Sequence, residues 1–558
     1  MHVAAFAALS TRLHSRHWRF ILRLTMVDMT VVSRTRMREW RVKWGMGQLR
    51  AMRAATGFVL FSAIAIFAAP LPTTATVAPA SARCAHAHTL PADRTRATFV
   101  SAAFAATPRL IAAAAAARKP QASEMQTYPE RPTPSQPAVP NSPSAEKTPP
   151  QPPKTEMYTL SGDRYEKAIA YSRAEYVLYF VSYLLSVFVL IVILRLGIAA
   201  RLRAFAERKT PNHWLQGLIL IPLLIAVLDL CSLPIHLYGH SLSLRFEQSV
   251  ENWGPWFWDW AKSELLGIGA AILMVMVLFR VMRWSPRRWW FFFWVAALPI
   301  LLFIFFISPW FVDPMFNTFH PLEEKYPALA AEMEKVSQRA GLNIPTDRMF
   351  LMDASKKTND VNAYVTGFGA SKRIVVWDTT VQKLTTDETL FIFGHESGHY
   401  VLNHIRNGFT FFAVGLLAAL FVGYRLFNWA IGRWGRSWGI EGPEDWASLA
   451  AMLLILEILV FVAMPIENGY SRMQEHNADV YGLEVVHGLV PNSAEVAAHS
   501  FQVLGEIGLA DPNPPALITF WLYSHPPLAE RLVFAHTYDP WSKGEPPKYV
   551  KSLPPPPK

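Results

Sequence analysis

The sequence predicts a mainly α-helical protein that spans a membrane several times and carries a small domain with a β-sheet outside it. Three observations lead to this prediction: long apolar segments recur along the chain, charged residues are few, and one stretch has short strand-like patterns between two apolar segments. Of the 558 residues, 52% are hydrophobic and 17% are charged. Soluble domains carry about 25% charged residues. The two cysteines are too few for a disulfide framework.

Six apolar segments are long enough to cross a bilayer, which takes about 20 helical residues. Tryptophan gathers near their ends, as at 256–260 and 289–290, which is typical of membrane interfaces. We therefore expect six transmembrane helices and a lipid bilayer as a partner. Pro465 is expected to end or kink the last of these helices. The segments are 176–194, 214–233, 264–281, 289–311, 409–428 and 447–466.

The basic residues indicate how these helices cross the membrane. The net charge is +11, but lysine and arginine stand beside the apolar segments, so no nucleic-acid partner is expected. Loops 195–209 and 280–288 are rich in arginine, whereas loop 234–262 has few basic residues. By the positive-inside rule the two basic loops lie in the cytoplasm. Residues 312–408 and 467–558 then fall on the opposite side.

Composition divides the chain into five regions. Residues 1–82 are basic and contain the apolar stretch 57–69, which is too short for a span, so this region resembles a secretory signal peptide. Residues 83–160 form an Ala/Pro-rich linker that we expect to be disordered. The other three regions are an N-terminal membrane domain with about four spans (161–320), a second unit with two further spans (321–545) and a Pro/Lys-rich tail (546–558).

The stretch between the fourth and fifth apolar segments has the pattern of a small mixed domain. Residues 323–340 have helical periodicity. Segments 348–353, 361–367 and 373–378 are predicted to be strands, and residues 367–372 are predicted to form the turn between the last two. A helix and a small sheet are therefore expected before the next motif.

That motif is an H-E-x-x-H pattern on a predicted helix. Thr385 and Glu388 have the spacing of a capping box and would start the helix. His395 and His399 are four residues apart, so a helix places both imidazoles on one face, where they can bind one zinc ion. Glu396 can then act on a water molecule at the metal. For this motif alone, two ordinary buried histidines are the alternative.

A second segment, 471–482, carries Glu475 and Asp479, again four residues apart. If it is helical, Glu475 can supply the third zinc ligand, and Asp479 can accept a hydrogen bond from the outer nitrogen of a ligand histidine. For this segment alone, two solvated acids are the alternative. His404 and His476 are rival ligands, but their spacing turns them away from the metal. The two helices together have the arrangement of the thermolysin-like (gluzincin) zinc peptidases.

In these and other motifs the chain resembles the membrane-embedded CAAX prenyl endopeptidases, the zinc metallopeptidases related to the a-factor-converting enzyme. The resemblance covers roughly residues 160 to 540 in the family's order. It implies an endopeptidase whose transmembrane helices enclose a chamber, with one Zn²⁺ bound by His395, His399 and Glu475, and with Glu396 as general base. The matching strings are PMFNTFHPLEE (314–324), VNAYVTGFGASKRIVVWDTTV (361–381), HESGH (395–399), SRMQEHNAD (471–479) and SHPPLAERL (524–532).

Three further residues are site candidates on the thermolysin-like pattern. His525 is expected to donate a hydrogen bond to the oxyanion that forms during hydrolysis, and Arg531 to orient it or a nearby acid, or to contact the substrate. Asn362 begins the string NAYVTG, which resembles the family's edge strand. Such a strand can hold an extended peptide by main-chain pairing, with Asn362 contacting the substrate backbone. The plainer alternatives are a turn residue before Pro526 for His525 and an ordinary strand for Asn362.

The expected function is hydrolysis of a membrane-associated or prenylated-like polypeptide by metal-activated water. By the topology above, the catalytic site lies on the non-cytoplasmic side of a bacterial-type inner membrane. One alternative is a catalytically silent zinc-containing scaffold, which a fourth protein ligand such as His476 or His525 would favour. Another is a transporter with an accessory domain, which internal repeats would favour. The sequence leaves open the physiological substrate, the oligomeric state and the role of residues 1–160.

Overall fold

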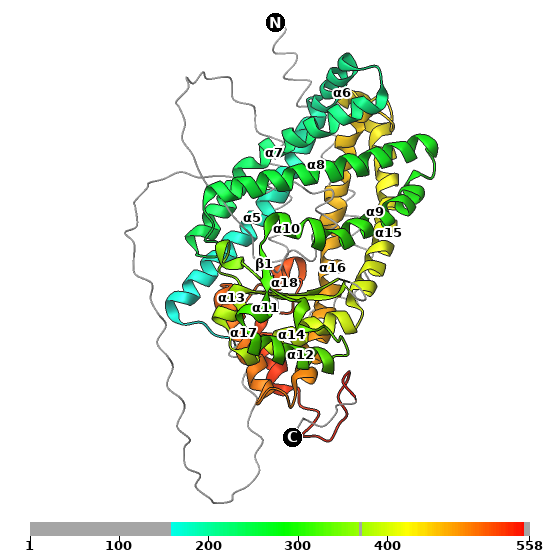
Figure 1. Ribbon diagram of the computed structural model, residues 1–558. Coiled ribbons are helices and arrows are strands. Elements are labelled where there is room, and N and C mark those ends of the chain that lie inside the picture. The colour runs from blue at the N-terminus through cyan, green and yellow to red at the C-terminus, as the bar shows by residue number, and fades with distance from the viewer. Residues whose placement is uncertain (1–157, 368–370, 552–558) are drawn as a thin grey trace, which may run out of the picture. The chain divides into compact units, whose positions relative to one another are not determined.

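The computed structural model describes residues 158–367 and 371–551 (Figure 1). The signal-like region 1–82 lies outside the described residues, as do nearly all of the linker and the end of the tail. The middle of the predicted turn 367–372 lies outside them as well. Long helices make up most of the described part, and a small sheet lies at one end of them (Figure 1).

Six long helices confirm the six predicted spans, and most are longer than the apolar segment that predicted them. Their outward side chains include Leu230, Leu265 and Ile466, which are 69%, 73% and 68% exposed. Soluble proteins rarely expose large apolar patches, so these helices have the surface of membrane-spanning segments. They are α5 (Gly162–Arg195), α7 (His213–Arg245), α8 (Trp253–Trp284), α9 (Trp289–Phe311), α15 (His404–Trp434) and α16 (Leu449–Val486).

Helix α16 does not end at Pro465, which was one of the two expected outcomes at this residue. It runs unbroken for 38 residues and carries the sixth span and the segment with Glu475 on one helix. Proline removes one backbone donor, and neighbouring helices can make up for that loss in a membrane bundle. The third expected ligand is therefore fixed rigidly to a transmembrane helix.

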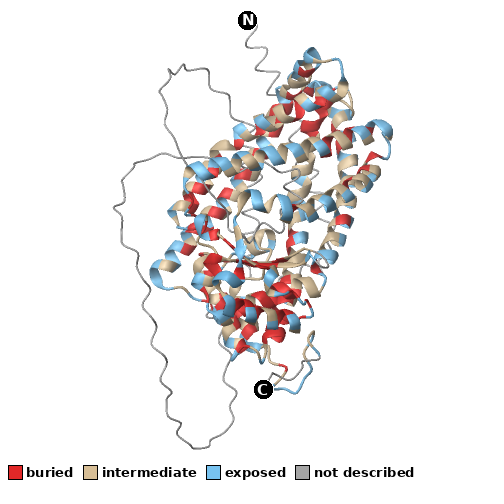
Figure 2. Cartoon of the chain, viewed as in Figure 1, coloured by how far each residue is buried: buried red, intermediate tan, exposed pale blue. Residues whose placement is uncertain are grey.

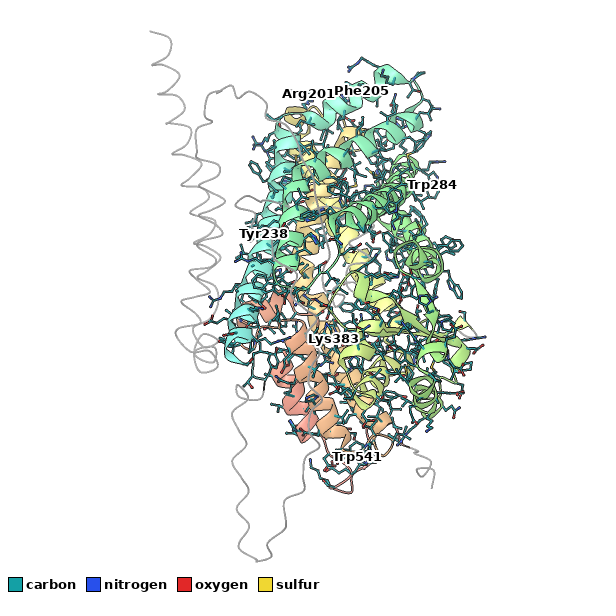
Figure 3. The ribbon with its side chains drawn as sticks, turned by 60° about the vertical axis from the view of Figure 1, so that its left-hand side comes forward. Arg201, Phe205, Tyr238, Trp284, Lys383 and Trp541 are labelled. Carbon is teal, nitrogen blue, oxygen red and sulfur yellow. The ribbon has the colours of Figure 1, made fainter. Side chains whose placement is uncertain are left out.

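The basic loop and the small domain lie at opposite ends of the long helices. Helix α6 (Ile198–Lys209), which holds Arg201 and Phe205, lies at one end, and Trp541 lies at the other (Figure 3). The sheet and helix α14 (Thr386–Val401) lie at the same end as Trp541 (Figure 1). The separation of basic loops from the small domain that the sequence predicted is thus present in the structure.

The sheet has four strands in the order β1-β2-β4-β3. The three predicted strands are confirmed with shifts of one or two residues at their ends. Strands β2 and β4 pair in parallel, and β3 pairs antiparallel to β4 and forms an edge. Sequence analysis missed β1, since three residues are too few to show an alternating pattern. The strands are β1 (Phe319–Pro321), β2 (Met349–Met352), β3 (Ala363–Thr366) and β4 (Arg373–Trp377).

Short helices lie at the same end as the sheet, and several of them contribute to its hydrophobic core. The predicted helix 323–340 is divided at Tyr326, where Pro327 starts a second helix. Figure 2 shows that buried residues gather around the sheet, in the lower part of the view. The helices are α10 (Asp313–Phe316), α11 (Leu322–Lys325), α12 (Pro327–Arg339), α13 (Asp378–Lys383), α17 (Ser493–Ile507), α18 (Ala516–Leu522) and α19 (Leu528–Thr537). Single 3-10 turns are η3 (Thr346–Arg348), η4 (Ala354–Lys356), η6 (Gly435–Trp438) and η7 (Trp446–Ser448).

Glycines allow α14 and α16 to pack closely. A Cβ atom on Gly394 would lie 2.9 Å from Val485 Cγ1, and one on Gly482 would lie 2.8 Å from the backbone nitrogen of His395. Both distances are too short for real side chains, so only glycine fits. These glycines bring the backbone of the H-E-x-x-H helix directly against the helix that carries Glu475.

Candidate active site

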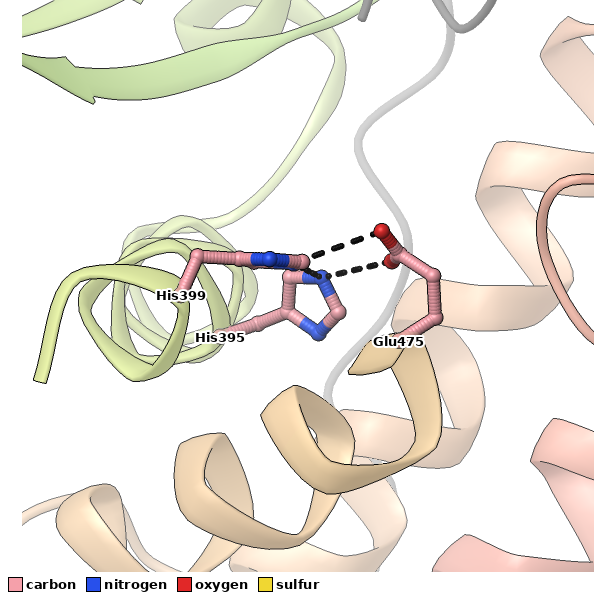
Figure 4. A group of neighbouring side chains, drawn as sticks. All are labelled: His395, His399 and Glu475. Carbon is pink, nitrogen blue, oxygen red and sulfur yellow. Dashed lines mark hydrogen bonds and ion pairs between the residues drawn. The ribbon is translucent and has the colours of Figure 1, made fainter. Parts of the chain in front are cut away.

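The side chains of His395, His399 and Glu475 converge between α14 and α16 (Figure 4). The capping box predicted at Thr385 and Glu388 is present and starts α14. The two Nε2 atoms of the histidines are 3.1 Å apart. His395 Nε2 lies 3.2 Å from one oxygen of Glu475, and His399 Nε2 lies 3.4 Å from the other.

The three donor groups match what a zinc ion requires. A tetrahedral zinc with bonds of about 2.0–2.1 Å separates neighbouring ligand atoms by about 3.3–3.4 Å, close to the distances between these groups. Within the described residues, the three donor atoms all lie within 4.8 Å of one another. Two imidazoles and one carboxylate are also a ligand set found at catalytic zinc. The residues therefore fit the ion.

Asp479 lies behind His395, on the side away from the converging atoms. Its Oδ1 is 2.8 Å from His395 Nδ1, so the carboxylate can fix the tautomer that leaves Nε2 free for a metal. Burial by itself lowers the pKa of His395, but hydrogen bonds with Asp479 and Glu475 raise it to about 9. Two carboxylates thus stabilise positive charge at this buried site, whether a proton or a metal ion carries it.

Arg531 pairs with Asp479 from helix α19. Its Nε and Nη2 lie 2.9 and 2.6 Å from the two carboxylate oxygens, and the residue is buried. Its guanidinium also covers the ring of Phe501, 4.2 Å from the ring centre. This position favours the expected role of orienting an acid. The alternative role, contact with the substrate, stays a prediction.

His404 lies behind the other histidine. Its Nδ1 is 3.2 Å from His399 Nδ1, so it contacts the outer nitrogen of His399 and takes no place among the three converging groups. Sequence analysis placed it off the metal face, which is confirmed, but missed this contact. The contact arises because the chain turns at Asn403, whose φ is +56°. Spacing alone gave no signal for that turn.

Glu396 and His525 complete the surroundings of the converging groups. Glu396 lies on α14 between the two histidines and is 9% exposed. His525 Nε2 lies 3.1 Å from Glu475 Oε2, and its Nδ1 lies 3.0 Å from the Ser524 hydroxyl. The side chain of His525 is 25% exposed, so it borders open space.

His476 and His525 could each have supplied a fourth ligand and closed the site, but among the described residues neither belongs to the group of donors. In the part of the chain that the structure describes, that group consists of His395, His399 and Glu475. His525 contacts Glu475 of these three through its Nε2. His476 is exposed on α16 and packs against Phe534, with ring centres 5.0 Å apart.

Asn362 directly precedes the edge strand β3, which packs against α14. Its carbonyl accepts from the Thr380 hydroxyl at 2.7 Å and from the Trp377 backbone at 3.0 Å. These bonds fix the backbone at the start of the strand. Asn362 thus lies one residue before β3 and not within the strand as predicted, and its contact with a substrate stays a prediction.

Comparison with known proteins places this arrangement in a family. Residues 323–538 match peptidase family M48, and residues 144–318 match the family described as CAAX prenyl protease N-terminal, five membrane helices. The uncharacterized metalloprotease YhfN of Bacillus subtilis is 34% identical over 372 residues, which are 66% of this chain and 85% of that protein. CAAX prenyl protease 1 of Saccharomyces cerevisiae is 28% identical over 342 residues, which are 57% of this chain and 71% of that protein.

A solved structure has the same fold. The crystal structure of S. mikatae Ste24p aligns with a TM-score of 0.59 at 24% identity and covers 68% of this chain and 90% of that chain. The class of protein is therefore a multispanning membrane metallopeptidase. The chain belongs to peptidase family M48 and is a zinc metalloprotease.

Proposed function

We propose that this protein is a gluzincin-type endopeptidase that holds one Zn²⁺ with His395, His399 and Glu475. The observation that carries the proposal is the convergence of two Nε2 atoms and one carboxylate from two helices within 4.8 Å of one another. Asp479 behind His395 supports it, because outer partners of this kind fix metal-binding imidazoles. When bound, zinc supplies Lewis acidity that polarises a peptide carbonyl and acidifies water.

The chain's own residues supply the proton transfers. Glu396 acts as general base: its carboxylate takes a proton from the attacking water and passes that proton to the leaving amine. His525 donates a hydrogen bond from Nε2 to the carbonyl oxygen as negative charge develops there. Its contact with Glu475 Oε2 at 3.1 Å supports this role, since the ring stands at the edge of the donor group.

The substrate is held beside α14 by the edge strand. An extended peptide can pair with the outer main-chain groups of β3, as an added strand does at a free sheet edge. Asn362 lies at the start of this strand, where its side chain can contact the substrate backbone. The catalytic unit in this proposal comprises residues 321–545, and residues 161–320 form the membrane domain that precedes it.

The substrate class is a membrane-associated or prenylated-like polypeptide. Relatives named CAAX prenyl protease 1 support a substrate with a lipid-modified end, and the six spans support one that reaches the site from the membrane. The arginine-rich helix α6 lies at the end opposite α14, which supports a site on the non-cytoplasmic side of a bacterial-type inner membrane (Figure 1).

The test is proteolysis by the purified full-length protein in detergent, with and without a zinc chelator. Glu396→Gln keeps the shape of the side chain and all three donor groups but removes the base. We expect zinc content to stay near that of the wild type and cleavage of fluorescein-labelled casein to fall by at least about 10³-fold. Turnover by Glu396→Gln at the wild-type rate would remove the base from this mechanism.

The same assay separates the other functions that the sequence allowed. A zinc-containing scaffold would bind zinc but show no cleavage that a chelator abolishes. A transporter would need neither bound zinc nor peptide cleavage for its activity. Casein cleavage that stops with the chelator and returns with added zinc is the result expected of a peptidase.

A further inference from the structure

One face of α16 carries more than the expected ligand. Asn468, Arg472, Glu475 and Asp479 are spaced by four, three and four residues, so they share one face of the helix. Each of them contacts a group that lies outside α16. Sequence analysis identified the last two only.

The first two residues of this face bind the end of the short helix α18. Asn468 Nδ2 donates to the carbonyl oxygen of Trp521 at 2.6 Å. Arg472 Nη1 donates to the carbonyl oxygen of Thr519 at 3.0 Å and also to that of Tyr523. Asn468 is buried at 5% exposure. Three carbonyls at the C-terminal end of α18 thus have side-chain partners on one neighbouring helix.

Helix α18 depends on such partners for physical reasons. It has seven residues, and isolated helices this short are not stable in water. The last carbonyls of a helix have no partner inside it. A cationic donor at this end satisfies them and also interacts favourably with the helix dipole. Arg472 and Asn468 therefore fix where α18 ends.

The residues that follow α18 lead directly to His525. Tyr523, whose carbonyl Arg472 binds, is two residues before it. After His525, two prolines lead into α19, where Arg531 bonds Asp479. Two contacts with α16 therefore flank His525: Arg472 binds the chain before it, and Asp479 binds Arg531 after it. Both Arg472 and Asp479 lie on the face of α16 that carries Glu475.

We propose that Arg472 is a positioning residue for His525. It holds the chain before His525 at a fixed distance from Glu475, just as Arg531 holds the chain after it. His525 then stays where its Nε2 lies 3.1 Å from Glu475 Oε2. This inference rests on the proposed function for the role of His525, but the positioning itself concerns contacts of this chain alone.

The test compares Arg472→Ala, Arg472→Lys, His525→Ala and the double variant Arg472→Ala/His525→Ala in the full-length protein with zinc. Misplacing a group by about 1 Å can cost about 10²-fold in rate, so Arg472→Ala is expected to lower kcat on fluorescein-labelled casein by about 10- to 100-fold. KM and zinc content should stay near the wild-type values. Arg472→Lys keeps a donor and should recover part of the rate.

The double variant gives the sharpest result. If Arg472 acts through His525, its loss causes no further decrease in kcat once His525 is absent. An equal fold-loss in both backgrounds, a loss of zinc, or a wild-type kcat for Arg472→Ala would each overturn the proposal. Arg164→Ala is a matched control, because Arg164 also donates to a backbone carbonyl, that of Glu506 in α17, which is outside the segment that carries His525. It should leave kcat unchanged.

A second measurement does not depend on activity. Added chymotrypsin can cut after Phe520, Trp521 or Tyr523, and release of the end of α18 should make these sites accessible. We expect Arg472→Ala to be cut there at least about 10-fold faster than the wild type and than Arg164→Ala, because local opening governs cleavage. Equal cutting rates would overturn the positioning role. If the wild type cleaves no casein, the peptidase function is refuted. The rates of chymotrypsin cutting then still test the role of Arg472.

Discussion

The two halves of α16 lie in different surroundings, although the helix is continuous. In its first half, residues 452–464 are mostly apolar and partly or fully exposed, as a membrane-facing surface requires. In its second half, residues 478–486 are all buried, and they include Asp479 and Glu484. The first half has one carboxylate, Glu457, among apolar side chains. The second half buries charges, so it depends on partners from other parts of the chain.

That difference explains where function lies in the molecule. A buried carboxylate is tolerated only when other groups bond it. Glu475, Asp479 and Glu484 each have such groups, supplied by α14, by α19 and by the segment after α19. Substitutions in the two halves should therefore have unequal effects.

Glu475→Ala should have the largest effect. Losing an outer partner of a metal ligand already costs about 10- to 100-fold in metal affinity, so losing the ligand should cost more than about 100-fold and abolish cleavage. Elemental analysis of the purified protein measures the zinc. Glu467→Ala is the matched control on the same helix, because Glu467 is exposed. Equal zinc in both variants would mean that another group is the third ligand.

Gly482→Ala should disturb the contact between α14 and α16. The added Cβ would lie 2.8 Å from the backbone nitrogen of His395, and such overpacking costs about 1–3 kcal/mol. Thermal unfolding in detergent should show a lower Tm, together with weaker zinc binding. Gly469→Ala on the same helix is the control, since its nearest neighbour would be 3.7 Å away. A Tm for Gly482→Ala as high as that of the control would contradict this account of the contact.

Glu484→Ala should release the segment after α19. The Glu484 carboxylate is fully buried and accepts from the backbone nitrogens of Lys548, Tyr549 and Val550 and from the Tyr538 hydroxyl. Removing it leaves buried donors unpaired, at about 1–3 kcal/mol. Limited trypsin digestion should then cut at Lys548 faster than in the wild type, while zinc content is retained. Unchanged digestion would show that other contacts hold the segment.

Pro465→Ala should have the smallest effect. The helix is already continuous at this position, so alanine restores one backbone donor without changing the path of α16. We expect a Tm within about 2 °C of the wild type, since the path of α16 stays the same. A large loss of activity with normal zinc content would instead show that the proline sets the position of Glu475.

Much of the fold and the centre of the site follow from local patterns in the sequence. Apolar length predicts the six spans, and a four-residue spacing on a helix predicts that His395 and His399 share a face. These predictions succeed because they depend only on the geometry of a single element. The missed strand β1 and the division of the helix at Tyr326 belong to elements too short to show a period.

The sequence by itself determined which residue types could hold a metal and which segments prefer a bilayer. Only the tertiary structure decided that Arg531 binds Asp479, that His404 lies behind His399, and that Arg472 holds the end of α18. Arg531 and Asp479 are 52 residues apart in the chain, and Arg472 and Thr519 are 47 apart. Helical periodicity fixes the direction in which a side chain points from the axis of its helix. Which group it contacts there depends on how separate helices pack.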